Sequence, residues 1–197
     1  MTSKALPFSF FSGSTLAVAR ALLGQVLVRR FGNIRHEAEI VEVEAYTADE
    51  PACHAYGGPR PRCQVMFGPA GHAYVYFIYG MYHCLNVVTE EEGIAGAVLI
   101  RALADKVLET STEPTQSSQK SKKLLLNGPG KLCRQLEIDL HFNGIPLFDA
   151  KQQLYIKSGR TINNSEVAVS PRIGITKAID LPWRFYLKDH KSVSRGK

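Results

Sequence analysis

Residues 74–86 read YVYFIYGMYHCLN, and five aromatic rings fall within the first nine positions of this stretch. Aromatic and β-branched side chains suit a pleated strand, whereas Gly80 interrupts the run. The stretch therefore predicts two strands joined by a turn at Gly80, which form a β-hairpin with an aromatic tip. We expect this hairpin to project from a curved, mostly antiparallel sheet in a mixed α+β domain.

Side chains along the first strand of this hairpin alternate between two faces. One face carries Tyr74, Tyr76 and Ile78, and the other carries Val75, Phe77 and Tyr79. Tyr76 and Tyr79 are thus predicted to point in different directions, so that one ring can line a pocket while the other faces outward. An exposed apolar turn such as Tyr79-Gly80-Met81 is typical of proteins that unstack bases from the minor groove. A hairpin buried in the core is the alternative.

The chain has 197 residues, of which 45% are hydrophobic and 21% are charged. These are ordinary globular values and allow one sizeable core, so residues 1–197 are expected to form one domain. The charge is uneven, because residues 1–100 carry 7 basic and 9 acidic side chains whereas residues 101–197 carry 17 and 9. The second half is therefore about +8, which favours a polyanionic partner.

The sequence favours a soluble intracellular protein. It has no run of 18 apolar residues, and the apolar stretch near its start is interrupted by prolines, glycines and an arginine. The four cysteines form no CxxC pair and no dense disulfide pattern, so we expect reduced thiols at Cys53, Cys63, Cys84 and Cys133. Cysteine and histidine also gather at Cys53, His54, Cys63, His72, His83 and Cys84, but the irregular gaps do not match structural zinc spacing. We therefore predict no metal site.

The N-terminal part predicts one helix followed by two strands. Leu16, Ala19 and Leu23 share a helical stripe, Ser or Thr can cap its start, and Gly24 can end it. Residues 25–30 and 34–46 then alternate as strands around a turn at residues 31–33.

Strict alternation in the second of these strands places Ile40, Glu42, Glu44 and Tyr46 on one face. Two carboxylates and one aromatic ring would then look the same way. A solvated outer face is one explanation, since carboxylates are usually exposed. The other explanation is a functional site, because a loop over residues 47–62 follows with His54, and loops on a rigid scaffold often carry function.

The C-terminal half is predicted as short strands and turns, with strands at 147–148, 153–157, 167–169, 173–176 and 183–187. Residues 109–123 are rich in Ser, Thr and Gln and predict a solvated loop. Residues 190–197 predict a basic, frayed tail. Lys122, Lys123 and Lys131 flank a turn at residues 128–130 where phosphate oxygens could bind, although a plain glycine turn is the alternative.

Many short motifs in this chain resemble the alkyladenine (3-methyladenine) DNA glycosylase family. They are EVEAY (42–46), CHAYGG (53–58), MF (66–67), YVYFIYGMY (74–82), Asn86, LIRAL (99–103), NGPGKLC (127–133), PRIG (171–174) and PWRFY (182–186). The motifs span most of the chain in family order, which makes coincidence improbable.

The resemblance implies a monofunctional enzyme of base-excision repair that flips alkylated or otherwise damaged purines from duplex DNA and replaces them with water. It implies Glu44 as the residue that activates the water, with Arg101 holding the site. It further implies a base pocket at Tyr46, His54, Tyr76 and Asn86, and DNA contacts at Tyr79, Met81, Tyr82 and Lys131. Damaged double-stranded DNA is then the expected partner, without a membrane or a cofactor. We expect a monomer that is associated with DNA in the cytoplasm, at the nucleoid, or in a nucleus.

Two other function classes stay open on the residues alone. A non-catalytic nucleic-acid-binding module would use the same hairpin and basic half but would give Glu44 no role. A metal-dependent hydrolase would need Cys53, His54, Cys63 and His83 as ligands, and chelators would abolish its activity.

Overall fold

The computed structural model describes residues 4–104, 108–111 and 124–194. Its sheet is built around the long strand β2 (Ile34–Thr47), which pairs antiparallel with β1 (Val26–Phe31), β5 (Gly96–Leu103), β6 (Leu108–Ser111) and β9 (Arg184–Leu187). The first half of β2 lies between β1 and β6, and its second half lies between β5 and β9. The register shifts between Ile40 and Val43, where β2 changes partners. Such an irregularity bends a strand, so the sheet curls at this point.

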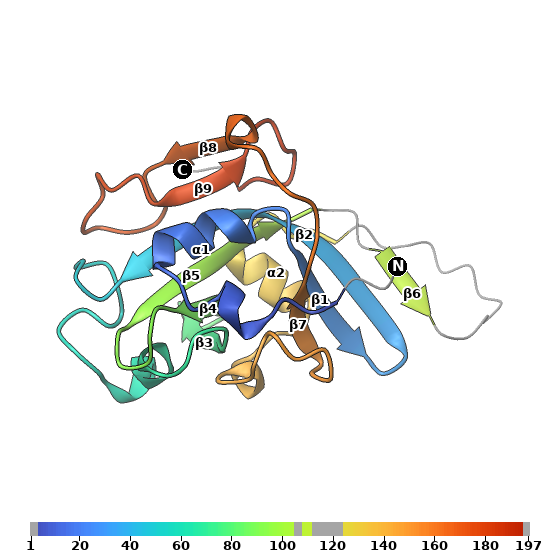
Figure 1. Cartoon of the computed structure of the whole chain (residues 1–197), viewed down its shortest axis with the longest axis horizontal. Helices are drawn as coiled ribbons and strands as arrows, with labels where there is room; N and C mark the ends of the chain where they lie inside the picture. The colour runs from blue at the N-terminus through green and yellow to red at the C-terminus, as the bar shows by residue number, and fades with distance from the viewer. Residues whose placement is uncertain (1–3, 105–107, 112–123, 195–197) are drawn as a thin grey trace.

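The other strands extend this sheet on both sides (Figure 1). They are β3 (Ala73–Ile78), β4 (Tyr82–Thr89), β7 (Leu154–Lys157) and β8 (Val167–Ser170). The strand order is β3-β4-β5-β2-β1-β7, and β8 pairs with β9. All of these pairs are antiparallel. The expected α+β class with a curved, mostly antiparallel sheet is confirmed.

Helix α1 (Thr15–Leu22) confirms the helix predicted near the N-terminus, and its buried face includes Val18, Ala19 and Leu22. The side chain of Ser14, the N-cap residue, makes no capping hydrogen bond. The amide of Thr15 instead donates to Glu90 Oε1 at 2.5 Å. Gly24 follows the helix with φ +82°, a conformation that glycine adopts without steric cost. The remaining helical elements are η1 (Phe8–Phe10), η2 (Pro61–Phe67), α2 (Pro129–Gln135), η3 (Leu140–Phe142) and η4 (Asn164–Glu166).

Two apolar clusters support the fold. The larger one packs α1 and α2 against the sheet and contains Leu22, Val43, Ile100 and Leu132. The smaller one lies under the loop after β2 and contains Cys53, Cys63, Met66, Tyr74, Val88 and Ala97. All four cysteines are buried thiols. Within the described part of the chain, no helix is both long and apolar enough to cross a bilayer.

Several predictions for the C-terminal half need correction. Strands β7, β8 and β9 match three of the predicted strands, but residues 147–148 and 173–176 are irregular. A turn was predicted at residues 128–130, but Gly128 is the N-cap of α2 and the next two residues begin this helix. A solvated loop was predicted at residues 109–123, but residues 109–111 belong to β6 and pair with the beginning of β2. The rest of that loop, with Lys122 and Lys123, lies outside the described residues.

Residues 190–194 also differ from the frayed tail that was predicted. Ser192 and Ser194 are buried, and Ser194 donates to Glu42 through its amide at 2.6 Å and through its hydroxyl at 2.7 Å. The fully buried Glu42 carboxylate needs hydrogen-bond donors, and this segment supplies two of them. The tail was predicted from composition alone, and composition does not reveal that Glu42, far away in the sequence, accepts hydrogen bonds from this segment.

Candidate active site

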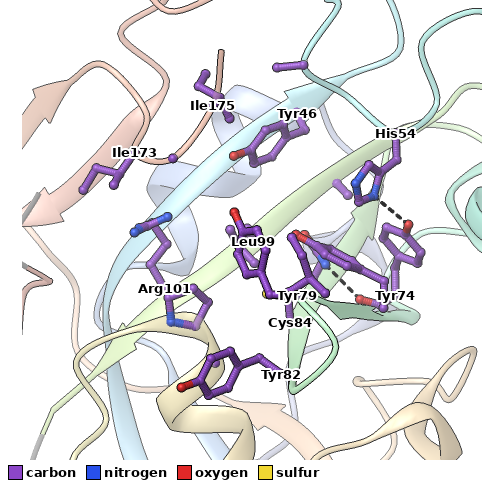
Figure 2. A pocket seen from close by; sticks show the side chains of 18 of the residues that line it. Tyr46, His54, Tyr74, Tyr79, Tyr82, Cys84, Leu99, Arg101, Ile173 and Ile175 are labelled. Atoms are coloured by element: carbon purple, nitrogen blue, oxygen red, sulfur yellow. Dashed lines mark hydrogen bonds between the residues drawn. The ribbon is translucent and has the colours of Figure 1, made fainter. Parts of the chain in front are cut away.

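A cavity of about 480 Å³ opens where β2, β3, β4 and β5 meet the segment 173–177. Aromatic rings form much of its wall (Figure 2). The predicted site residues that line it are Tyr46, His54, Tyr76, Tyr79, Tyr82, Asn86 and Arg101. The structure therefore gathers residues from positions 46 to 101 around one cavity.

Glu44 lies directly behind this wall and has no exposed surface. Its Oε1 accepts a hydrogen bond from the Ile173 amide at 2.7 Å, and its Oε2 accepts one from the Tyr46 hydroxyl at 2.8 Å. Arg101 Nη1 lies 3.1 Å from the same Oε2. Because Tyr46, Arg101 and Ile173 all line the cavity, the carboxylate is one residue layer away from it. The alternative prediction, that this face of β2 is exposed to solvent, is therefore wrong.

Glu42 shares the face of Glu44 and is also fully buried, but it contacts other partners. Its Oε1 accepts from Arg101 Nε at 3.1 Å and from Arg184 Nε at 2.7 Å, in addition to the bonds from Ser194. Arg101 therefore bridges the two carboxylates. Although burial alone lowers the pKa of Arg101, the Glu44 and Glu42 carboxylates raise it above its usual value. The guanidinium is thus a fixed positive charge at the cavity wall.

A second buried arginine joins three separate parts of the site. Arg172 forms a bidentate ion pair with Glu50, at 2.6 and 2.9 Å, and donates to the Ala45 carbonyl at 2.9 Å. Its guanidinium carbon lies 4.5 Å from the centre of the Tyr46 ring and 5.3 Å from that of Trp183. Bidentate pairing with stacking suits a planar guanidinium and fixes its orientation. The end of β2, the loop after it and the segment 171–178 are therefore held together.

His54 lies in the aromatic wall and is neutral at physiological pH. Burial, followed by the charges of Arg62 and Arg60, lowers the pKa of His54 to about 4. Its Nδ1 hydrogen-bonds with the Tyr74 hydroxyl at 2.8 Å (Figure 2). Its ring meets that of Tyr76 edge-on, with the ring centroids 4.6 Å apart.

Two phenols of the cavity wall, those of Tyr46 and Tyr76, are also neutral. Burial, with added repulsion from Glu44, raises the pKa of Tyr46 well above its usual value. Burial likewise raises the pKa of Tyr76. Tyr46 is therefore a hydrogen-bond donor to Glu44. Asn86 is buried beside these rings and donates to the Tyr74 carbonyl at 3.0 Å.

The turn between β3 and β4 presents the most exposed aromatic ring near the cavity. Tyr79 and Met81 are 74% and 65% exposed. Alternation holds as far as Ile78, since Tyr74, Tyr76 and Ile78 all line the cavity. Tyr79 was predicted on the opposite face, but it also lines the cavity. The reason is its place in the turn: its φ is +55°, so the alternation of an extended strand does not continue through it.

Two further predicted DNA-contacting residues lie at the edge of the site. The Tyr82 ring packs on Gly130 of α2, where an added Cβ would lie 2.8 Å from Tyr82 Cγ. Only glycine permits this approach. Lys131 is exposed and its Nζ donates to Asn127 Oδ1 at 3.1 Å. Neither Lys131 nor Met81 lines the cavity.

The possible metal ligands identified in the sequence do not converge. In the residues that the structure describes, no three or more His, Cys, Asp or Glu side chains lie close enough to hold one metal ion. His54 and Cys84 both line the cavity, but they contact Tyr74 and Tyr76.

Sequence reasoning missed Glu50, Arg172 and the wall formed by residues 173–177. Arg172 and Ile173 occur in a motif of the family resemblance, but no role was predicted for them. Their partners lie 122 and 129 positions away in the sequence, so no local periodicity could reveal the contacts.

The sequence is similar to known proteins over most of its length. A family model described as methylpurine-DNA glycosylase matches residues 9–191. A relative from Carboxydothermus hydrogenoformans, named "Putative 3-methyladenine DNA glycosylase", is 48% identical over 96% of this chain and 98% of its own length. Relatives with the same name from Synechococcus sp. (strain JA-3-3Ab) and Methanoculleus marisnigri are 47% and 44% identical. These two alignments cover 90% and 96% of this chain, and 92% and 98% of the relatives.

Proposed function

The chain belongs to the methylpurine-DNA glycosylase family, and from this premise we propose that its aromatic cavity receives a damaged purine flipped out of duplex DNA. The protein is a monofunctional DNA glycosylase of base-excision repair. In such an enzyme, water replaces the damaged base at C1′ of the deoxyribose. The N-glycosidic bond breaks, the purine leaves with the bonding electrons, and the water loses a proton.

The observation that carries the proposal is the position of Glu44 behind the cavity wall. Glu44 Oε1 accepts one hydrogen bond, from Ile173, so this oxygen keeps an acceptor position for the attacking water. Because the Glu44 side chain has no exposed surface, the bound nucleotide must shift Tyr46 or the segment 173–177 to admit that water. Proton acceptance by a positioned carboxylate is typically worth ~10²–10⁴ in rate.

The same carboxylate also supports the sugar electrostatically. As the base leaves, positive charge develops on the deoxyribose ring, and a preorganised negative charge stabilises it. Arg101 fixes the orientation of Glu44 by its contact with Oε2. In this scheme Glu44 is the catalytic base, and Arg101 holds it and faces the nucleotide from the cavity wall.

The cavity walls suit a flat, electron-poor base. Tyr46, His54 and Tyr76 provide rings, and Asn86 provides an amide for discrimination among bases. Because His54 is neutral, it does not repel a purine that carries a positive charge after alkylation at N3 or N7. An aromatic face attracts such a cation by about 0.5 to 2 kcal/mol.

The turn at residues 79–81 suits the opening of the duplex. Extruding a nucleotide costs a few kcal/mol, and this cost is lowest for damaged or mismatched pairs. Tyr79 is exposed beside the cavity mouth and can fill the vacancy in the stack. Met81 and Tyr82 lie beside it, and Lys131 can contact a phosphate. We propose that the protein works as a monomer, without a cofactor, in the compartment that holds the DNA.

The main alternative to this proposal is a purely structural role for Glu44, because a buried carboxylate paired with arginine can hold two strands together. The test is incubation of the protein with alkylated duplex DNA in EDTA, followed by detection of free base. Release by the parent protein but not by Glu44→Gln supports the proposal. Release that EDTA abolishes would favour a metal-dependent hydrolase. Binding of the DNA without release of base would favour a non-catalytic module.

A further inference from the structure

Both phenol rings of the proposed base pocket carry an arginine guanidinium. The Arg172 guanidinium carbon lies 4.5 Å from the centre of the Tyr46 ring. The Arg62 guanidinium carbon lies 5.4 Å from the centre of the Tyr76 ring. Neither arginine lines the cavity, whereas both rings do. The part of each ring that faces the cavity is therefore not the part that the arginine covers.

A guanidinium over one face of a ring changes what the other face can bind. The attraction of a ring for a cation comes from the negative potential of its π-system. A positive charge on one side draws that electron density toward itself and also repels a second cation on the opposite side. A ring with an arginine on its outer face is therefore a weaker partner for a cationic base than a free ring, whereas a neutral base is little affected.

Glu50 offsets the charge of Arg172, whereas no carboxylate pairs with Arg62 in the part of the chain that the structure describes. Glu42 pairs with Arg101 and Arg184, Glu44 pairs with Arg101, and Glu50 pairs with Arg172. Three buried carboxylates are thus matched by three buried arginines. Lys177 lines the cavity, and Arg60 and Arg62 stand beside His54. The potential of the last two arginines reaches the pocket, because it contributes to the lowered pKa of His54.

From this arrangement we infer that Arg62 is a specificity-determining residue, which reduces the preference of the pocket for cationic alkylpurines and so favours neutral damaged purines. The inference rests on the proposed function, in which Tyr46 and Tyr76 hold the flipped base. It concerns recognition of the flipped base before the bond breaks, so binding is the quantity that tests it.

Arg62 is the better residue for an experiment, because it is exposed whereas Arg172 is fully buried. Arg60 is a matched control from the same segment. It carries the same charge, also lowers the pKa of His54, and donates to the Tyr56 carbonyl, and no ring contact joins it to Tyr76 in the described residues. Arg62→Gln and Arg60→Gln each remove one positive charge, but only the first removes a guanidinium from a pocket ring.

The experiment measures the affinity of Glu44→Gln, Glu44→Gln/Arg62→Gln and Glu44→Gln/Arg60→Gln for two duplexes. One contains 7-methylguanine and the other contains hypoxanthine, each opposite cytosine, at mildly acidic pH where 7-methylguanine stays cationic. Contacts to phosphate and any loss of active protein change both affinities by the same factor, so they do not change the ratio of the two. We expect Arg62→Gln to shift this ratio toward 7-methylguanine by about two- to five-fold, the value of one exposed cation–π contact. Arg60→Gln should leave it unchanged.

An unchanged ratio in Arg62→Gln, or an equal shift in both arginine variants, would overturn the inference. The proposed function is tested separately by release of base from both duplexes by the protein with Glu44 intact. If neither base is released, the proposed function fails. If both are released and the ratio does not respond to Arg62, only the inference fails.

Discussion

The backbone amide of Ile173 donates to Glu44 Oε1 at 2.7 Å, across 129 positions of sequence. Because Ile173 follows Arg172, the ion pair of Arg172 with Glu50 also sets the position of this amide. The carboxylate is thus oriented by a segment that also forms part of the cavity wall. The proposed function of Glu44 as a base therefore depends on that wall.

Glu44→Gln should reduce single-turnover excision of an alkylated purine by at least ~10² while leaving affinity for the DNA nearly intact. The amide keeps the shape of the side chain but cannot accept the proton of the water. Quenched time courses with enzyme in excess measure the rate, and equilibrium titration measures the affinity. Excision near the rate of the parent protein would rule out Glu44 as the base.

Glu42→Gln should affect stability more than chemistry. Glu42 is fully buried between Arg101 and Arg184, and removing one partner of such a group typically costs about 3–5 kcal/mol. Excision per folded molecule should fall less than in Glu44→Gln. Thermal unfolding and single-turnover kinetics on the same samples separate the two effects. A stable but inactive Glu42→Gln protein would reverse the roles of the two carboxylates.

Tyr79→Ala and Tyr76→Ala should respond differently to the stability of the duplex around the lesion. Tyr79→Ala leaves the vacancy in the stack unfilled, and stacking is worth ~1–3 kcal/mol per base. Its defect should be largest in a paired duplex and smallest in single-stranded DNA. Tyr76→Ala removes part of the pocket wall and should lose a similar factor in every context. Equal losses by both mutants in paired, mismatched and single-stranded substrates would contradict this division.

Binding to DNA should weaken steeply with salt, because the half of the chain after residue 100 carries the excess of basic residues. Each phosphate contact adds roughly −0.9 to the slope of log K against log salt concentration. Lys131→Gln should reduce the magnitude of the slope by about one contact. Titrations at several salt concentrations give the slope, and a flat response would place the basic residues away from the DNA.

The lowered pKa of His54 predicts how the free energy of unfolding depends on pH. The pKa of His54 is about 4 in the folded protein, below the unfolded value of about 6.5, so the unfolded chain binds more protons between these values. The contribution of His54 to stability is therefore complete above pH 6.5 and is lost as the pH falls toward 4. Denaturant unfolding at several pH values should show a weaker acid dependence in His54→Gln. Identical pH dependence in both proteins would mean that the pKa of His54 is the same in the folded and the unfolded protein.

Patterns in the sequence predicted the helices and strands whose formation depends on neighbouring residues. The helix at residues 15–22, the long strand of Glu42 and Glu44, and the alternation of Tyr74, Tyr76 and Ile78 all follow from periodicity. Periodicity ended at Tyr79, where the backbone enters a positive φ. It also could not reveal Arg172, Ser194 or the segment 173–177, because their roles arise from contacts with β2 that only the folded chain creates.

The contact of Ser194 with Glu42 has a consequence for synthesis of the protein. Glu42 leaves the ribosome 152 residues before the donor that completes its hydrogen bonds. Until that donor is available, a nascent chain that closes its sheet would bury an incompletely paired carboxylate next to Arg101 and Glu44. Contacts of such long sequence separation form late and slowly. The part of the sheet that carries Glu42 and Glu44 should therefore be the last to reach its native arrangement, and chains terminated before Ser194 should be substrates for quality-control proteases.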